Sequence, residues 1–190
     1  MKTTARFLIT TAMALALALG AGAQSYNLKA PIATKPAFLT SAGQSADVEM
    51  AKVLLDRAKI PYKADTQAKT GSLAASGAKS LVIAIGGSSK GLGAAGVSSE
   101  AELVRVKDIV AEARKLGMKI IGLHIGGEAR RGELSDVFIR DVTPLCDYVI
   151  VVSEGNKDGL LTKLCAQAKI PLDSVDKISK VVDPLARAFR

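Results

Sequence analysis

Two segments of the chain end in the same way and lead into loops rich in hydrogen-bonding side chains. Residues 80–85 and 118–125 are apolar, β-branched runs, and they stop at the glycine pairs 86–87 and 126–127. Buried parallel strands deliver their carboxyl ends to ligand crevices in this way. The loops that follow carry hydroxyls, arginines and the chain's single histidine, which can bind carboxylates or phosphates and move protons. The sequence therefore predicts a site at these strand ends without naming its reaction.

The loop after the first segment is dense in glycine. Residues 86–96 read Gly-Gly-Ser-Ser-Lys-Gly-Leu-Gly-Ala-Ala-Gly. Glycine lets the backbone approach a ligand closely or adopt positive φ, and Ser88, Ser89 and Lys90 add donors and one positive charge. Loops that follow strands often carry binding residues. We interpret this loop as a binding element; the alternative is a loop that is only flexible.

Local likenesses to dinucleotide enzymes fall in the same loop. Residues 91–96 fit the pattern G-x-G-x-x-G, and residues 82–93 resemble the cofactor turn of the short-chain dehydrogenases. That resemblance implies an NAD(P)-binding protein. However, His124 occupies the position of the acidic ribose ligand, and Tyr148 is followed four residues later by Val152, where that family has lysine. We interpret the likeness as incidental and expect no cofactor.

Two further patterns are typical of a hydrolase and of a flavoprotein. Residues 87–91 match the nucleophile elbow G-x-S-x-G with Ser89 as nucleophile. The helix that should begin at once to form the oxyanion hole is not predicted there. Residues 40–45 loosely resemble a flavodoxin phosphate loop, but the neighbouring loops lack the stacking aromatic residues of flavin sites.

His124 near the end of the segment 118–125 has two interpretations. If its ring points to the edge of the sheet, it is a proton carrier or a ligand contact near neutral pH. If it points into a helix-covered face, it is a hydrogen-bonded core residue. The alternation places it on the same face as Gly122, where there is space. Glu128, close by in sequence, is a second candidate for acid–base chemistry.

The loop after His124 also supplies two guanidinium groups. Arg130 and Arg131 are suited to carboxylate or phosphate, although at least one is expected to pair with Glu128 or Glu133. The sequence has no cysteine cluster and no acidic spacing of the calcium type. We therefore expect no metal site.

Strand and helix signals alternate along the chain, which indicates a parallel sheet with right-handed crossovers. We predict a three-layer αβα fold with a five-stranded parallel flavodoxin-like sheet in the order 2-1-3-4-5. Strands are expected at 37–41, 60–64, 80–85, 119–125 and 147–152, and helices at 45–58, 100–116, 133–145 and 157–168. Ser45 is the expected N-cap of the first helix. The tail 173–189 reads as an amphipathic helix split by Pro184.

In this fold four loops share the carboxyl edge of the sheet. They are residues 40–45, 86–98, 124–133 and 153–159. Each precedes a helix, whose free backbone N–H groups and dipole attract anions.

The chain has two cysteines, Cys146 and Cys165. The first precedes the fifth strand and the second lies late in the helix that runs back beside it. A disulfide is geometrically plausible in an oxidising compartment; the alternative is two buried thiols.

The amino terminus reads as an export signal. Residues 1–6 are basic, residues 7–19 are apolar, and Ala21-Gly-Ala23 is a small-residue cleavage site. The apolar stretch is shorter than the roughly 20 residues that span a bilayer. We predict a signal peptide at 1–23, a flexible lead at 24–36 and one domain at 37–190, located in the periplasm or outside the cell without stable membrane insertion after cleavage.

The excess of basic over acidic residues does not indicate that the chain binds nucleic acid. There are 26 Lys and Arg against 18 Asp and Glu, but the charges are interspersed and there is no tryptophan. Nucleic-acid binding needs clustered positive charge or stacking rings. The excess would still help attract a small anion.

The chain as a whole resembles a family of exported bacterial domains of unknown function. The resemblance rests on residues 40–47, 86–96, 124–136 and 154–159, and it covers residues 37–188. It implies a shared fold and export but lends no chemistry.

We therefore expect an exported domain that binds a small anionic or polar metabolite at the glycine-rich loops. The alternative is a small enzyme of hydrolase or isomerase type that uses His124 or Glu128 at the same place; a dehydrogenase-like protein or a ligand-free partner-binding module are further options. The expected contacts are Ser41, Gln44, Ser45, Gly87, Ser88, Ser89, Lys90, Gly91, His124, Gly126, Gly127, Arg130 and Arg131.

Overall fold

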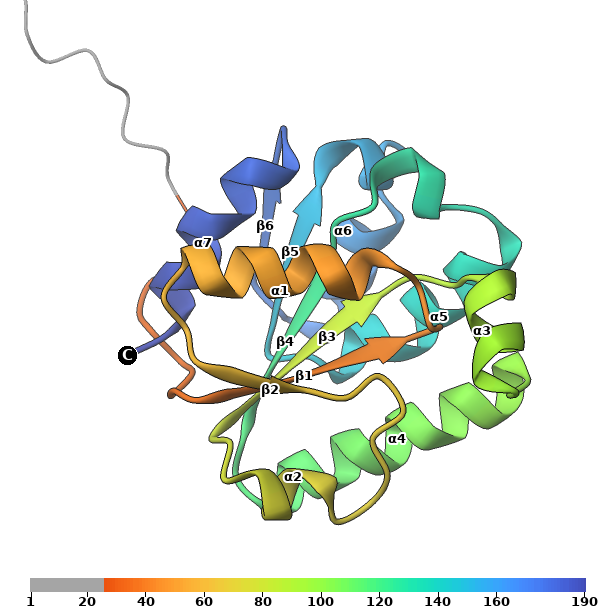
Figure 1. The fold of residues 1–190 in the computed structure, drawn as a ribbon. Coiled ribbons are helices and arrows are strands. Elements are labelled where there is room, and N and C mark those ends of the chain that lie inside the picture. The colour runs from red at the N-terminus through yellow and green to blue at the C-terminus, as the bar shows by residue number, and fades with distance from the viewer. Residues whose placement is uncertain (1–25) are drawn as a thin grey trace, which may run out of the picture.

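The sheet has six parallel strands in the order β2-β1-β3-β4-β5-β6 (Figure 1). The structure, a computed structural model, describes residues 26–190. The predicted signal peptide and its cleavage site lie outside the described residues. The strands are β1 (Ala37–Ala42), β2 (Tyr62–Ala64), β3 (Ser80–Ile85), β4 (Lys119–His124), β5 (Tyr148–Val152) and β6 (Leu172–Val175).

The predicted parallel α/β architecture is confirmed, but the prediction of five strands is wrong. Five strands follow the order 2-1-3-4-5, and β6 adds a sixth beside β5, where Val149 pairs with Leu172. This strand is short and contains Asp173 and Ser174, so its hydrophobic signal is weak and the tail reads as a helix.

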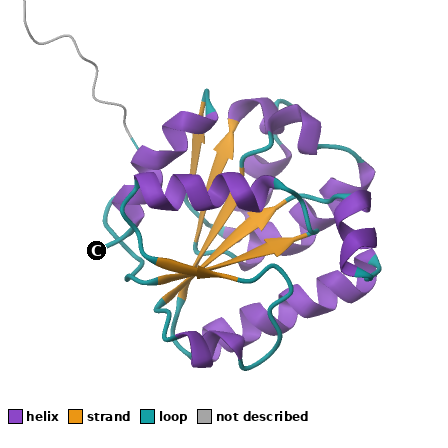
Figure 2. Cartoon of the chain, viewed as in Figure 1, coloured by secondary structure: helices purple, strands orange, loops and turns teal. Residues whose placement is uncertain are grey.

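Helices cover both faces of the sheet (Figure 2). One face packs against α1 (Asp47–Arg57) and α7 (Val182–Ala188), and the other against α4 (Ser99–Lys115), α5 (Glu133–Val142) and α6 (Leu160–Ala168). Shorter elements are α2 (Ser72–Ser76), α3 (Ser89–Ala95) and the 3-10 helices η1 (Gly127–Arg130), η2 (Thr143–Leu145), η3 (Ser153–Asn156) and η4 (Ile178–Val181). Within residues 26–190, none of the helices combines the length and the apolar character that crossing a membrane requires.

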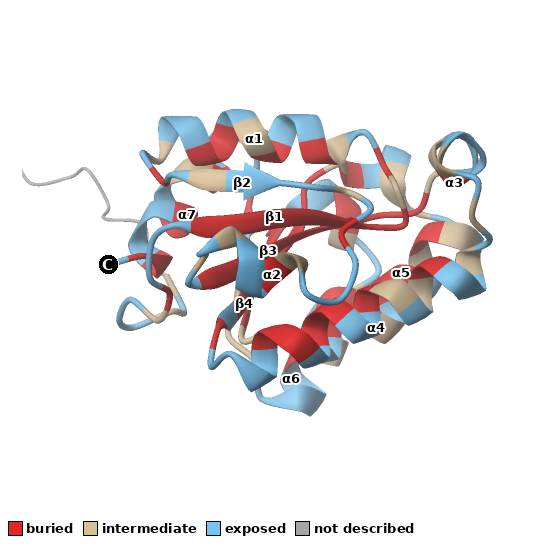
Figure 3. Cartoon of the chain, turned by 60° about the horizontal axis from the view of Figure 1, so that its bottom comes forward, coloured by how far each residue is buried: buried red, intermediate tan, exposed pale blue. Residues whose placement is uncertain are grey.

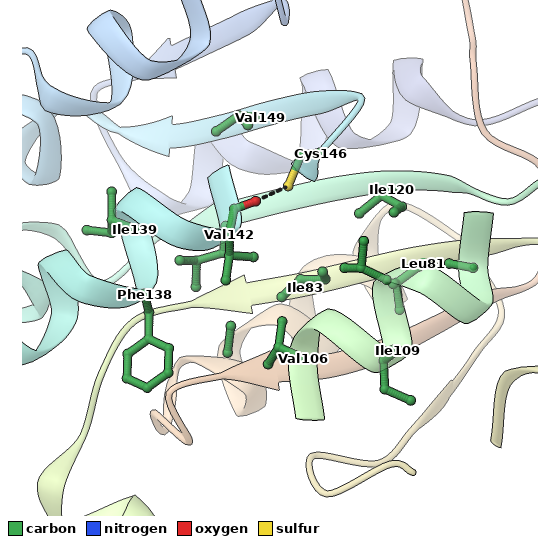
Figure 4. Packing of buried hydrophobic residues seen from close by; sticks show 14 of the residues in the cluster. Leu81, Ile83, Val106, Ile109, Ile120, Phe138, Ile139, Val142, Cys146 and Val149 are labelled. Carbon is green, nitrogen blue, oxygen red and sulfur yellow. Dashed lines mark hydrogen bonds between the residues drawn. The ribbon is translucent and has the colours of Figure 1, made fainter. Parts of the chain in front are cut away.

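Strands β1, β3 and β5 are buried along their whole length, and β4 is buried after Lys119 (Figure 3). Leu81 and Ile83 face the α4 side, where they share a cluster with Val106 and Phe138 (Figure 4). Val82 and Ala84, which alternate with them, belong to the cluster on the α1 side. An apolar run without alternation is what a strand covered on both faces requires.

The described part of the segment before β1 is held by hydrogen bonds to distant residues. Asn27 N donates to Asp173 Oδ1 at 2.7 Å, and Thr34 N donates to Ser80 Oγ at 2.8 Å. Ala33 forms an isolated bridge with Phe189, so this segment joins both chain ends to the sheet.

Candidate functional site

Polar side chains meet where β1, β3 and β4 end. Arg130 Nε donates to Asp47 Oδ1 at 3.2 Å. A β-carbon built on Gly86 would lie 3.4 Å from Asp47 Oδ2 and 3.5 Å from Ser45 Oγ, so both oxygens face the same stretch of backbone. A β-carbon built on Gly126 would lie 2.6 Å from Asp47 Oδ2. We call Ser45, Asp47, Gly86, Gly126 and Arg130 the carboxyl-edge cluster.

The carboxyl edge also holds most of the buried polar atoms that lack a partner. Within residues 26–190, the buried side-chain atoms without a hydrogen bond are Ser41 Oγ, Ser45 Oγ, Asp47 Oδ2, His124 Nε2 and Thr143 Oγ1. All but that of Thr143 lie at the carboxyl ends of β1 and β4 or in the turn that leads to α1. Leaving a buried polar group without a hydrogen bond costs about 1–3 kcal/mol, so each of these atoms calls for a partner such as a bound molecule.

Ser45 does not have the structural role that the sequence suggests. The N-cap of α1 is Ala46, and no side chain caps that helix, so the prediction of Ser45 as N-cap is wrong. The hydroxyl of Ser45 is therefore not used by the helix end. Asp47, which is not among the predicted contacts, is the first residue of α1. Its place two residues after Ser45, in the segment that follows β1, was the available signal for a site residue.

Arg130 and Arg131 differ sharply in how they are held. Arg131 donates to both oxygens of Asp136, to both oxygens of Asp158 and to the carbonyl of Gly155, at 2.7–3.0 Å. These bonds depress the pKa of Asp136 and Asp158. Arg130 makes one side-chain bond among the described residues, that to Asp47. Arg131 is therefore a structural clamp, whereas the outer nitrogens of Arg130 are open to a ligand.

His124 is a buried residue on the α4 side of the sheet. Its side chain is 0% exposed, and Nδ1 lies 2.9 Å from the carbonyl oxygen of Ile85. A carbonyl only accepts, so Nδ1 carries the proton. A β-carbon on Gly155 would lie 2.6 Å from Nε2, which shows that η3 covers the ring. Burial lowers the pKa of His124, and the Ile85 hydrogen bond and the charge of Asp47 only partly oppose this shift.

Several predicted contacts are exposed and do not join the cluster. Ser89 and Lys90 lie in the first turn of α3 and are exposed. Glu128 is exposed and accepts from Lys157 Nζ at 2.6 Å. That ion pair lowers the pKa of Glu128.

The glycine-rich loop is more ordered than expected, because it contains α3. Ser88 is the N-cap of that helix and its hydroxyl accepts from Gly91 N at 3.0 Å. A β-carbon on Gly91 would lie 1.8 Å from Gln44 O, and one on Gly87 would lie 2.8 Å from Leu134 Cγ. These two glycines are therefore required for helix packing.

A buried ion pair on α4, not foreseen from the sequence, fixes the turn after β1. Glu102 is 1% exposed, and its Oε1 accepts from Gly43 N and from Gln44 Nε2, each at 3.1 Å. Arg105 donates to Glu102 and to the carbonyl of Ser41. The pair lies on the buried side of an amphipathic helix, so the spacing of Glu102 and Arg105 was the available signal.

Cys146 and Cys165 are free, buried thiols, and the disulfide that the sequence allows is not formed in this structure. Cys146 Sγ donates to Val142 O at 3.5 Å (Figure 4). Burial raises the pKa of both thiols, that of Cys165 to about 11. Gly127 is also one of the predicted contacts. It belongs to η1 and is buried beside the side chain of Glu154.

Solved structures with a related arrangement are distant. A mutant form of flavodoxin from Pseudomonas aeruginosa is 12% identical, with 80% of this chain and 93% of that chain covered and a TM-score of 0.40. The esterase EstA from Pseudoalteromonas sp., in a structure inhibited by monoethylphosphonate, is 11% identical with the same coverage and a TM-score of 0.35. Among curated proteins, no match is found.

A family profile, in contrast, matches most of the described chain. It covers residues 34–189, from the segment before β1 to the residue after α7, and it therefore includes every strand and the whole carboxyl-edge cluster. The resemblance expected from the loop sequences is confirmed at the level of the family. The chain belongs to the family described as domain of unknown function DUF6305.

Proposed function

We propose that this chain is an exported domain that binds a small anionic or polar metabolite at the carboxyl-edge cluster. The observation that carries the proposal is that Ser45 Oγ and Asp47 Oδ2 are buried without partners beside the backbone of Gly86. A ligand that supplies hydrogen bonds to these atoms would remove the cost of leaving them unsatisfied.

The donors and acceptors of the cluster limit the ligand class. The outer nitrogens of Arg130 suit a carboxylate or phosphate, which a guanidinium binds in a fork. Asp47 Oδ2 can only accept while ionised, so it requires a hydroxyl or an ammonium group on the ligand. A carboxylate that also carries a hydroxyl or an amine satisfies both groups.

Binding would require one movement, which breaks a single side-chain bond. The Arg130 side chain is 29% exposed and rests on Asp47 through a single bond of 3.2 Å. Asp47 is 13% exposed, and a hydrogen bond to a charged group contributes about 1.5–3 kcal/mol, which the bonds of Arg130 to a bound carboxylate would replace. We propose that Arg130 turns from Asp47 to the incoming carboxylate and opens access to Asp47 Oδ2.

The alternative of an enzyme requires His124 or Glu128 to reach the same ligand. His124 is covered by η3, and Glu128 is engaged by Lys157 at the surface. Binding without turnover is therefore the function that we propose.

A thermal-shift screen of the purified chain tests the proposal. The compounds are hydroxy- and amino-carboxylates, simple phosphates, sugars and nucleotides. A ligand at a hundredfold excess over its Kd stabilises a protein by about 2.7 kcal/mol, which corresponds to several degrees in Tm for a domain of this size. We expect such a shift from a member of the first class. The absence of a shift from every compound would contradict the proposal.

A further inference from the structure

The opposite edge of the sheet holds a cavity that the proposed function does not use. Its volume is about 360 Å³, within the range of small-molecule pockets. It is lined by Thr34, Leu73, Ala74, Gly77, Ala78, Lys79, Leu116, Gly117 and Met118. These residues belong to α2, the segments that precede β1 and β3, and the turn between α4 and β4. All lie near the amino ends of the strands, on the side of the sheet where Figure 1 shows α2.

The walls of this cavity are part apolar and part polar. Leu73 and Met118 are buried and form part of the core, whereas Leu116 is 48% exposed. Gly77 and Gly117 both have positive φ, and a β-carbon on either would meet no atom within 4 Å. Both glycines are exposed, so the cavity is open to solvent on this side, and Leu116 adds apolar surface to its rim.

One positive charge lines the same cavity, and other lysines are close to it in sequence. Lys79 lines it and, within residues 26–190, takes part in no salt bridge. Lys35, Lys115 and Lys119 are each adjacent in sequence to a lining residue, and Lys119 is the one among them that pairs, with Asp147. The carboxylate of Glu112, which reaches α2 from α4, uses its two oxygens on the N–H groups of Gly71 and Ala74.

We infer that this cavity is a second binding site, for a small amphipathic carboxylate. The apolar tail would lie against Leu116 and Ala74, and the carboxylate would face Lys79. The charge of Lys79 disfavours a cation. The apolar part of the walls offers an amphipathic carboxylate a contact that inorganic phosphate does not make.

NMR titration of the purified chain with sodium hexanoate tests this inference, with hexylammonium and hexan-1-ol as probes of the head group. Hexanoate should cause saturable shifts in the amides of Gly77, Ala78 and Gly117. Hexan-1-ol should bind more weakly at the same amides, and hexylammonium should bind weakest. Absence of saturable shifts at these amides, or equal binding of hexylammonium, would overturn the inference.

Two pairs of variants test separately how the apolar tail and the carboxylate of hexanoate contribute to binding. Ala74→Leu fills the cavity and should abolish the hexanoate shifts, whereas Ala75→Leu, on the same helix but outside the lining, should keep them. Lys79→Gln should weaken hexanoate by about two- to fivefold, as expected for an exposed charge pair, and leave hexan-1-ol unchanged. Lys90→Gln, at the other edge, should change neither. If hexanoate still binds Ala74→Leu as it binds the unchanged chain, the inference fails. The wild-type titration does not depend on these variants folding, nor on the carboxyl-edge cluster.

Discussion

Arg130 and Asp47 are 83 residues apart in sequence, yet Arg130 Nε lies 3.2 Å from Asp47 Oδ1. The parallel sheet causes this contact, because it delivers the ends of β1 and β4 to one edge. Asp47 begins α1 and Arg130 ends η1, so each side chain leaves its element close to the backbone of Gly86 and Gly126.

The first prediction compares two serine hydroxyls near this edge. Ser45→Ala removes a buried hydroxyl without a partner, so it should leave the free energy of unfolding unchanged or raise it by up to about 1 kcal/mol. Ser88→Ala removes the N-cap of α3 and should lower it by about 1 kcal/mol. Urea unfolding of both variants measures the difference. A Ser45 variant that loses more stability than the Ser88 variant would show that the Ser45 hydroxyl is already satisfied.

The second prediction concerns the Arg131 clamp. Its bonds lower the folded-state pKa of Asp136 and Asp158. A carboxyl whose pKa is lower in the folded chain stabilises it above the unfolded pKa of about 3.9, and this stabilisation is lost as the pH falls through the folded value. Arg131→Ala should therefore be destabilised relative to the unchanged chain near neutral pH, and the difference should shrink with acidification below about pH 4. Arg130→Ala is the matched control and should show a smaller loss at neutral pH. Unfolding midpoints of both variants, measured from neutral to acidic pH, test this prediction. Equal losses of stability in Arg131→Ala and Arg130→Ala would contradict the structural role of Arg131.

The third prediction concerns His124. Burial lowers its pKa below the unfolded value of about 6.5. The unfolded chain then binds a proton that the folded chain does not, so stability falls as the pH drops from about 6.5 toward the folded pKa. The ring ¹⁵N spectrum at about pH 6 should show a neutral imidazole with the proton on Nδ1, bonded to Ile85. A ring that titrates at or above 6.5 would indicate that η3 does not cover Nε2.

The sequence predicted where the site lies in the fold better than it predicted which side chains form it. The strand ends and their shared edge follow from apolar runs that end in glycine, which is a local signal, and Gly126 and Arg130 were expected in the loop after one of these runs. Asp47 and the Glu102–Arg105 pair could not be assigned in this way, because their importance depends on contacts between elements far apart in sequence. The same reason explains Ser45: the sequence shows a capping residue before a helix, but only the packing of Gly86 and Asp47 shows that its hydroxyl is not used for capping.

The fourth prediction concerns the two cysteines. Both are buried free thiols, and burial raises the pKa of Cys165 to about 11. The thiolate is the reactive form, so the folded chain should react slowly with a thiol reagent at neutral pH. After unfolding in denaturant without reductant, both thiols should react. A chain that shows no reactive thiol even when unfolded would contain the disulfide instead.

The binding proposal rests on the carboxyl-edge cluster, and isothermal titration of a screening hit on matched variants tests it most directly. Arg130→Gln removes the guanidinium of the cluster, whereas Arg57→Gln removes an exposed guanidinium at the far end of α1. We predict that a hydroxy- or amino-carboxylate binds the unchanged chain and Arg57→Gln with the same Kd, and that Arg130→Gln weakens binding at least tenfold, the loss expected for a charged hydrogen bond of about 1.5–3 kcal/mol. An unchanged Kd in Arg130→Gln would contradict the account.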